Sequence, residues 1–184
     1  MLTDEERRYL ITIARKALVC YFKGEPFTPP SPPLEHKNLY EKRGAFVTLT
    51  KKTKEGRLRG CIGALEGDKP LYQLIPELAL SSAFQDPRFP PLSGEELPEI
   101  KIEISILSPL YPGRPDEVEV GKHGIYTVRG VNRGVLLPQV ATEYNLTREE
   151  FLRQGCLKAG LPEDCYKDPN TELYLFTAEV FEED

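Results

Sequence analysis

Two stretches, GAFVTLT at residues 44–50 and RLRGCIG at 57–63, are joined by a short polar turn at 51–56. Both are rich in β-branched and apolar residues, so they predict a β-hairpin with a longer loop. A third stretch, EIKIEISIL at 99–107, has isoleucine at every second position, which is typical of a strand with one apolar face. These strands, with the helical patterns around them, predict an α+β fold with a mainly antiparallel sheet and packed helices.

The first half of the chain also carries two helical patterns and a proline-rich segment. Thr3 and Glu6 form a capping box for a helix that should end near Lys23, before a glycine. Residues 25–38 contain five prolines and predict an extended strap over the surface. Pro70 opens a second helix, in which Pro76 predicts a kink or a late start.

The second half repeats the order of elements. A hairpin is predicted from 123–129 and 134–137, then two helices beginning at Pro138 and Thr147, and one long strand over 171–181. Residues 108–115 are expected to form a loop. Because 44–107 and 123–181 share this order, a duplicated β-β-α-β unit is one interpretation.

Composition limits the class of protein. The chain has 184 residues, 40% hydrophobic and 29% charged, with a net charge of −5, which suits a single folded domain over 1–184. The acidic balance argues against a broad nucleic-acid surface. No window is apolar enough to cross a membrane and no signal peptide is evident, so we expect a cytoplasmic location.

The cysteines are Cys20, Cys61, Cys156 and Cys165, and none of them forms a CxxC pair. In a reducing cytoplasm the expectation is four free thiols. With only two histidines and no metal-ligand spacing, the sequence predicts neither a metal site nor a bound cofactor.

Cys61 is the strongest candidate for chemistry. Strand alternation would place Arg59, Cys61 and Gly63 on one face, with Leu58 and Gly60 towards the core. A guanidinium two positions from a thiol would stabilise the thiolate and lower its pKa. Gly60 and Gly63 would let a ligand or another backbone approach closely. The alternatives are an inert, buried cysteine and a bulge marked by the glycines.

Other side chains are candidates for proton transfer or binding. Glu103 lies opposite the isoleucines of its strand, where it could transfer protons or pair with Arg59 if the two strands are neighbours. The rigid loop QDPRFPPL at 85–92 presents Asp86 and Arg88, for ligand positioning or for structure. His123, at the start of a strand, could form a dyad with Cys61 or be structural.

A basic turn at residues 51–59 carries five lysines and arginines against one acid. These cations could bind the phosphate backbone of a nucleic acid, but the turn has no pattern of aromatic residues on which bases could stack. A solvated turn is therefore the favoured interpretation, and nucleic-acid binding is the less favoured one.

Several of these motifs resemble, in order, the AMMECR domain family, whose bacterial and archaeal members are also called AmmeMemoRadiSam system protein A. The resemblance covers about residues 3 to 182. A departure is Cys165-Tyr166, where members often carry a tryptophan. The segments that carry it are GAFVTL, LRGCIG, DPRFPPL, IEISIL, His123-Gly124, LPQV at 137–140 and Lys158-Ala159-Gly160.

The resemblance implies an α+β fold with a larger and a smaller part and a cleft between them. The motif residues would gather near that cleft, with Cys61, Glu103 and His123 as catalytic candidates. Binding candidates are Arg59, Gly60, Gly63, Asp86, Arg88 and Gln139. The family's name implies association with a Memo-like protein and a radical-SAM protein, which would hold any metal or cluster, since this chain lacks a cluster-binding cysteine triad.

The sequence therefore supports a first hypothesis, a cytoplasmic enzyme or accessory subunit. Its cleft would bind a small molecule or peptide, and Cys61 would be the reactive thiol. The alternative is a non-enzymatic adaptor that docks a Memo-like partner through the cleft rim and the proline-rich strap.

Overall fold

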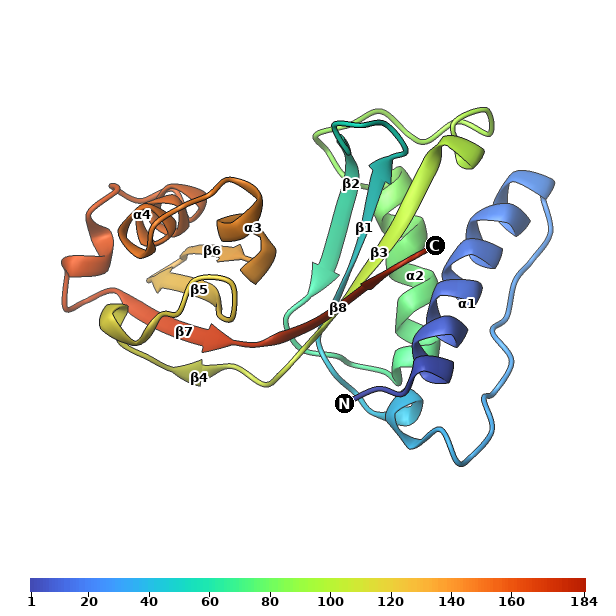
Figure 1. Cartoon of the computed structure of the whole chain (residues 1–184), viewed down its shortest axis with the longest axis horizontal. Helices are drawn as coiled ribbons and strands as arrows, with labels where there is room; N and C mark the ends of the chain where they lie inside the picture. Colours follow the sequence, from blue (N-terminus) through green and yellow to red (C-terminus); the bar gives the residue numbers. More distant parts are fainter. The chain divides into compact units, whose positions relative to one another are not determined.

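The computed structural model describes all 184 residues, and the chain divides into two compact units. The first unit comprises residues 1–107 and 179–184, and the second comprises 108–178. Each unit is built on one four-stranded sheet (Figure 1). The α+β class predicted from the sequence is confirmed, with antiparallel pairing in both sheets.

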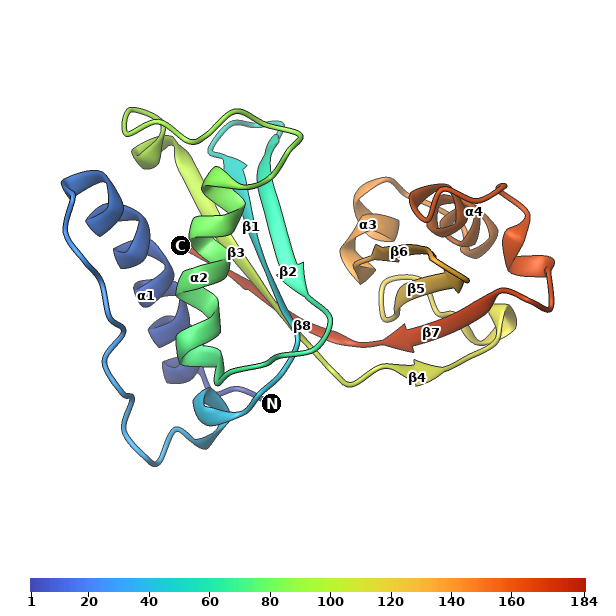
Figure 2. The same cartoon turned by 180° about the vertical axis from the view of Figure 1, so that it is seen from behind.

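The sheet of the first unit has the strand order β2-β1-β3-β8, so β2 is an edge strand. Both long helices pack on the same face of this sheet, as Figure 2 shows from behind. The isoleucines of β3 are fully buried beneath them, which explains their spacing of two. The elements of this unit are α1 (Asp4–Lys23), β1 (Ala45–Lys51), β2 (Leu58–Ala64), α2 (Leu71–Phe84), β3 (Ile100–Leu107) and β8 (Ala178–Glu182).

Helix α1 begins and ends as its sequence predicts. Thr3 and Glu6 form the complete capping box, and Gly24 adopts the left-handed conformation with φ of 70°. The prolines of the strap at 25–38 run over the two helices without regular structure, up to a short 3₁₀ turn. The hydroxyls of Tyr9 and Tyr40 hold the strap by donating hydrogen bonds to the carbonyls of Pro30 and Pro32.

Helix α2 differs from the prediction at Pro76. The helix starts at Leu71, directly after Pro70, and runs through Pro76 to Phe84 without an interruption. Pro76 lies in the second turn and has no N–H, so the carbonyl of Tyr72, four residues earlier, loses its usual helical donor while the helix continues. The expected late start is therefore wrong.

The sheet of the second unit has the strand order β4-β7-β5-β6. One expectation fails here: the long terminal strand predicted over 171–181 is two strands that belong to different sheets. β7 pairs with β5 in the second unit, whereas β8 joins the first sheet beside β3. A second difference is β4, which lies in the expected loop. The elements are β4 (Tyr111–Pro112), β5 (Gly124–Arg129), β6 (Asn132–Leu136), α3 (Pro138–Glu143), α4 (Arg148–Lys158) and β7 (Glu172–Phe176).

The repeated order of elements is present in the topology as well. In the first unit β1 lies between β2 and β3, and in the second β5 lies between β6 and β7. In each case a hairpin is followed by helix and by a third strand that pairs with the first strand of the hairpin. The two units thus share a β-β-α-β arrangement. The fourth strand of each sheet follows the third strand of the other unit: β8 follows β7 and joins the first sheet, and β4 follows β3 and joins the second.

The expectation of four free thiols is wrong for two of the cysteines. Cys156, near the end of α4, forms a disulfide with Cys165, and their Cα atoms are 5.8 Å apart. After α4 the chain turns at Gly160, which has φ of 76°, and returns Cys165 to the helix. Both sulfurs lie in a small buried cluster with Leu161. Cys20 and Cys61 are free.

Reducing this disulfide is expected to lower the stability of the second unit. A bridge across nine residues restricts the unfolded chain and contributes about 2.5 kcal/mol. Thermal unfolding should therefore occur at a lower temperature in the presence of a phosphine reductant. The variant with Cys20 and Cys61 both replaced by serine should show the same shift, because neither forms the bridge. Identical melting with and without reductant would contradict the prediction.

No helix of this chain has the length and apolar character needed to cross a bilayer.

Candidate functional site

Three side chains from adjacent strands of the first sheet form a row, which we call the polar row. Thr48 of β1 pairs with Cys61 of β2 on one side and with Glu103 of β3 on the other. Side chains directly opposite one another in a sheet have Cβ atoms about 5 Å apart. Since Val47, Leu49 and their partners point towards the helices, the polar row lies on the opposite face, which carries no helix of this unit (Figure 1).

The Cys61 thiol is held at the edge of this row. Its Sγ lies 3.2 Å from the hydroxyl of Thr48, and the residue is half-buried. Burial raises the pKa of the Cys61 thiol, whereas the Thr48 hydroxyl and the Arg88 guanidinium act in the opposite direction. The net shift is upward, so Cys61 is protonated at neutral pH and needs a base to react as a thiolate. The lowered pKa expected from the sequence is wrong.

The loop after α2 folds back onto the edge strand at Cys61. Asp86, which is 4% exposed, accepts the backbone N–H of Cys61 at 3.0 Å. It also accepts three hydrogen bonds from Arg88, one from the backbone and two from the guanidinium. These bonds hold the pKa of Asp86 well below its usual range. Asp86 therefore has a structural role, because it holds both strand β2 and the side chain of Arg88. Arg88 is the residue that this loop presents to a ligand.

Arg88 is the guanidinium that the structure brings to Cys61. Its side chain is 47% exposed, and its Nη2 lies 3.5 Å from the carbonyl oxygen of Cys61. Nε and Nη2 are bound to Asp86, which leaves Nη1 with two N–H donors for solvent or a ligand.

The two glycines flanking Cys61 allow other parts of the chain to approach closely. A Cβ atom on Gly60 would overlap the backbone carbonyl of Ser82 in α2, and one on Gly63 would overlap the ring of Phe46. Ser82 is fully buried and joins α2 to the hairpin, because its hydroxyl accepts the N–H of Ile62 and donates to the carbonyl of Val47. The absence of a side chain thus allows close packing at both positions, of Gly60 against α2 and of Gly63 against Phe46 in β1.

Arg59 does not share the face of Cys61, contrary to the alternation expected from the sequence. The register of β1 and β2 shifts between Leu49 and Thr50, so Leu58 pairs with Thr50 and is 39% exposed instead of facing the core. Arg59 is 5% exposed. A bulge of this kind interrupts the period of two.

The guanidinium of Arg59 is committed elsewhere. It donates two hydrogen bonds to Glu96 and one to the carbonyl of Pro90, and it holds the pKa of Glu96 down to about 2. Arg59 and Glu103 do not pair as neighbours, because β1 lies between their strands. Arg59 is therefore a structural residue that ties the loop at 85–96 to the hairpin.

His123 and Gln139 belong to the second unit. His123 is 8% exposed, its Nδ1 accepts the backbone N–H of Glu119 at 2.9 Å, and burial lowers its pKa. Gln139 lies in the first turn of α3. The structure gives no position for either residue relative to Cys61, so the dyad of Cys61 and His123 stays a prediction.

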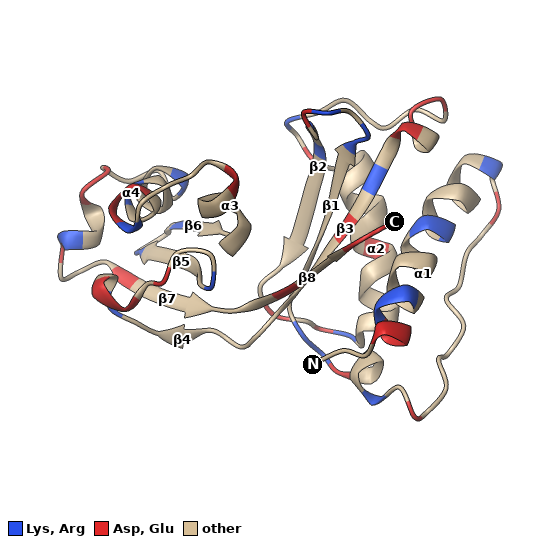
Figure 3. Ribbon diagram, in the orientation of Figure 1, with Lys and Arg blue, Asp and Glu red and all other residues tan.

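The tip of the first hairpin carries the basic turn at 51–59, whose lysines and arginines are blue in Figure 3. Two of its cations are already neutralised at short range: Lys51 and Arg59 both bind Glu96. Arg57 pairs with Glu55 at 3.6 Å. Pairing of these charges supports the solvated turn over a phosphate-binding loop.

No group of three or more histidine, cysteine, aspartate or glutamate side chains lies close enough to hold a metal ion. Thr48 and Ser82 are the site residues that sequence reasoning did not single out. Thr48 could have been found by counting the hairpin register outward from the turn, because that register places it opposite Cys61.

Comparison with known proteins gives one consistent family. The AMMECR1 family model matches residues 11–181. Protein MK0488 of Methanopyrus kandleri is 47% identical over 191 residues, covering all of this chain and 91% of that protein. A protein of Methanothermobacter thermautotrophicus is 45% identical and is covered to 97%. This chain also matches the crystal structure of uncharacterized protein PH0010 from Pyrococcus horikoshii, with 41% sequence identity and a TM-score of 0.92. The match covers 100% of this chain and 94% of the chain in that structure.

Proposed function

Because this chain belongs to the AMMECR1 family, we propose that it acts through the polar row, where several of the segments that resemble that family meet. Its role is that of an enzyme or accessory subunit in which the Cys61 thiol is the reacting group. The observation that carries the proposal is the contact between Cys61 Sγ and the Thr48 hydroxyl on the helix-free face of the sheet, with Glu103 across from Thr48.

The arrangement suits addition of a thiol to an electrophilic carbonyl carbon. Thr48 would accept the S–H proton of Cys61 and pass its own proton to the carboxylate of Glu103, the candidate base. The sulfur forms a bond to the carbon, and the C=O π electrons move to oxygen. That oxygen then takes the proton from Glu103. The adduct is neutral, and Thr48 and Glu103 have returned to their initial protonation states.

The substrate class follows from Arg88. A guanidinium that is oriented by Asp86 and keeps Nη1 free beside Cys61 favours a substrate carrying a carboxylate or phosphate. The substrate is thus a small anionic molecule, or a peptide with an acidic group, that also has an electrophilic carbon.

The partners belong to the proposal as well. The resemblance of the sequence to the AmmeMemoRadiSam proteins supports work in the cytoplasm beside a Memo-like protein and a radical-SAM protein. Those partners would supply any metal or cluster chemistry, and this chain would supply the thiol.

Alkylation of Cys61 tests the proposal. In the Cys20→Ser variant Cys61 is the sole free thiol, so its rate can be followed by mass spectrometry. Because burial raises its pKa, the rate with iodoacetamide should keep rising with pH beyond 9.0, the ordinary value. At pH 7 iodoacetate, an anion, should react about threefold faster relative to iodoacetamide than it does with free cysteine, since Arg88 attracts it.

Matched variants separate the contributions. Arg88→Met should remove the preference for iodoacetate, and Thr48→Val should move the pH profile further upward because it removes the hydroxyl that favours the thiolate. Thr50→Val, one pair further along the same face, should change neither quantity. Failure of iodoacetamide to alkylate Cys61 at any pH that leaves the chain folded, or no preference for the anion, would remove Cys61 and Arg88 from the proposed role.

The adaptor function is the second candidate, and the upward pKa of Cys61 favours it, because binding a partner needs no thiolate. The two functions differ in what Cys61→Ser does. An adaptor keeps its affinity for a Memo-like protein in this variant and loses it in Arg88→Ala, whereas the thiol function is lost in Cys61→Ser at once.

A further inference from the structure

A phenylalanine ring lies next to the polar row. Phe46 precedes Thr48 by two positions in β1, so both side chains are on the helix-free face of the first sheet. It pairs with Gly63 of β2 on one side and with Ser105 of β3 on the other. Phe46 is half-buried and is not among the apolar side chains that pack against the core of this unit. The exposed part of its ring can therefore contact an apolar group of a ligand.

Gly63 determines where this ring lies. A Cβ atom on Gly63 would overlap Cγ and Cδ2 of Phe46, so the ring lies across the backbone of β2 at that glycine. Cys61 is two positions before Gly63 on the same face, which makes Cys61 and Phe46 diagonal neighbours. Diagonal neighbours in a sheet have Cα atoms about 7–8 Å apart, within reach of an aromatic side chain. The ring therefore borders the Cys61 thiol on the side of Gly63.

A cation borders the same thiol on another side. β2 is an edge strand, and its partner β1 carries Phe46 and Thr48. Asp86 accepts the N–H of Cys61 from the open side of β2, and Arg88 comes to the Cys61 carbonyl from the same loop. A molecule placed over the thiol thus meets a guanidinium outside the strand and an aromatic ring on the inner side.

We propose that the substrate of this site is a 2-oxo acid with a flat apolar side chain, and that Phe46 determines the specificity for that side chain. The inference rests on the function proposed for Cys61. A 2-oxo acid carries its carboxylate and its side chain on the two sides of an electrophilic carbonyl carbon, which is the order of Arg88, Cys61 and Phe46 in the site. The carboxylate accepts hydrogen bonds from Arg88, and the side chain packs on the ring.

The covalent step is the thiol addition already described, and it needs no other reactant. The Cys61 sulfur bonds to the carbonyl carbon, and the C=O π electrons move to oxygen. The S–H proton reaches that oxygen through Thr48 and Glu103, and the carboxylate keeps its charge throughout. Because no group leaves, the addition is reversible. A bound 2-oxo acid should therefore protect Cys61 reversibly against alkylation.

Protection by three probes tests the substrate class: phenylpyruvate, pyruvate and 1-phenylpropan-2-one. Alkylation of Cys61 by iodoacetamide is followed by mass spectrometry in the Cys20→Ser variant at pH 8, with free cysteine as the reference. Phenylpyruvate should protect at the lowest concentration. Pyruvate, which lacks the ring, should need about threefold more. The ketone, which lacks the carboxylate, should need about tenfold more.

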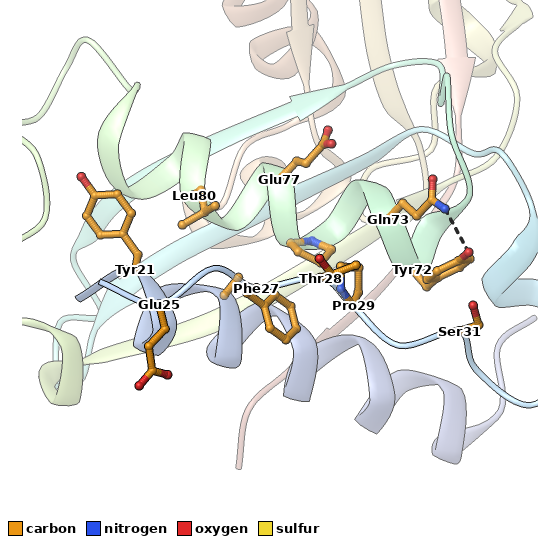
Figure 4. A pocket seen from close by; sticks show the side chains of 12 residues that line it. Tyr21, Glu25, Phe27, Thr28, Pro29, Ser31, Tyr72, Gln73, Glu77 and Leu80 are labelled. Carbon is orange, nitrogen blue, oxygen red and sulfur yellow. Dashed lines mark hydrogen bonds between the residues drawn. The ribbon is translucent and has the colours of Figure 1, made fainter. Parts of the chain in front are cut away.

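Variants assign the preference for the ring to Phe46. Phe46→Leu should remove the difference between phenylpyruvate and pyruvate, whereas Phe46→Tyr, which keeps an aromatic ring, should retain it and so guards against a folding defect. Arg88→Met should remove the difference between phenylpyruvate and the ketone. Phe27→Leu is the matched control and should change neither difference, because Phe27 lies on the strap beside the helices (Figure 4).

The outcomes separate this inference from the function on which it rests. If iodoacetate is preferred at Cys61 but phenylpyruvate protects no better than pyruvate, the 2-oxo acid assignment is wrong and the thiol function stands. Retention of the phenylpyruvate preference in Phe46→Leu would overturn the role of Phe46 in the same way. If Cys61 cannot be alkylated in the folded chain, both proposals fail.

Discussion

Replacing Asp86 by alanine is expected to lower the free energy of unfolding of the first unit by about 3 kcal/mol. The substitution leaves the backbone N–H of Cys61 without its acceptor and releases the guanidinium and backbone N–H of Arg88. The effect is at the lower end for a buried ion pair because Arg88 is half-exposed and water can reach it. Urea unfolding followed by far-ultraviolet circular dichroism measures the change.

The pH dependence gives a second signature of the same carboxylate. Since the folded pKa of Asp86 lies below its ordinary value of 3.8, its stabilisation is complete above that pH and is lost as the pH falls towards the folded value. The difference between the wild-type chain and Asp86→Ala should therefore shrink below about pH 4. Asp168→Ala, which breaks a half-exposed pair with Arg129, should cost less than about 1 kcal/mol. Equal costs for the two variants would show that Asp86 is not the anchor described.

Replacing Gly60 by alanine is the second large change, with an expected loss of about 3 kcal/mol. The added methyl group would overlap the carbonyl of Ser82, which is backbone and lies in the middle of a buried interface. Helix α2 must move away from β2, and the two hydrogen bonds of the Ser82 hydroxyl are stretched or broken.

Gly94→Ala is the matched control for this substitution. A Cβ atom at Gly94 would lie 3.5 Å from the ring of Phe22, which is ordinary contact. The urea midpoint for unfolding of Gly94→Ala should equal that of the wild-type chain within error, whereas the midpoint of Gly60→Ala should be lower. If both variants unfold at the wild-type midpoint, α2 and β2 can separate at little cost, and the packing described for Gly60 is wrong.

The strands and helices of this chain could be predicted because their signals are local. The isoleucines of 100–106 specify a strand with one buried face, and the Thr3 and Thr147 capping boxes specify the starts of two helices. Each signal lies within about four residues of the element it determines, so no knowledge of distant partners is needed.

The polar row could be predicted only in part, since it depends on strand order. The sequence identified Cys61 and Glu103 separately, but the strand between them decides that Thr48, and not Arg59, is the shared neighbour. A one-residue bulge at Arg59 also breaks the alternation on which its predicted face relied. Neither the order of strands nor a bulge is determined by the residues of one strand alone.

The disulfide and the division of the last strand escaped prediction for a similar reason. Spacing of nine residues between Cys156 and Cys165 allows a bridge only if the chain turns back after α4, which the structure shows at Gly160. Residues 171–181 read as one strand because both halves are rich in β-forming residues, yet Thr177 separates them and bonds to Ser108 instead.

The strand order has a consequence for any attempt to divide the protein. A fragment ending at Leu107 would lack β8 and would expose the long flank of β3 as an open edge, ready to pair with a second copy of itself. A ribosome releases the last six residues of the first unit only after all of the second has been made. The first sheet is therefore completed only after the second unit has been synthesised, and a recombinant form of the first unit should be made by joining 1–107 to 178–184 with a short linker.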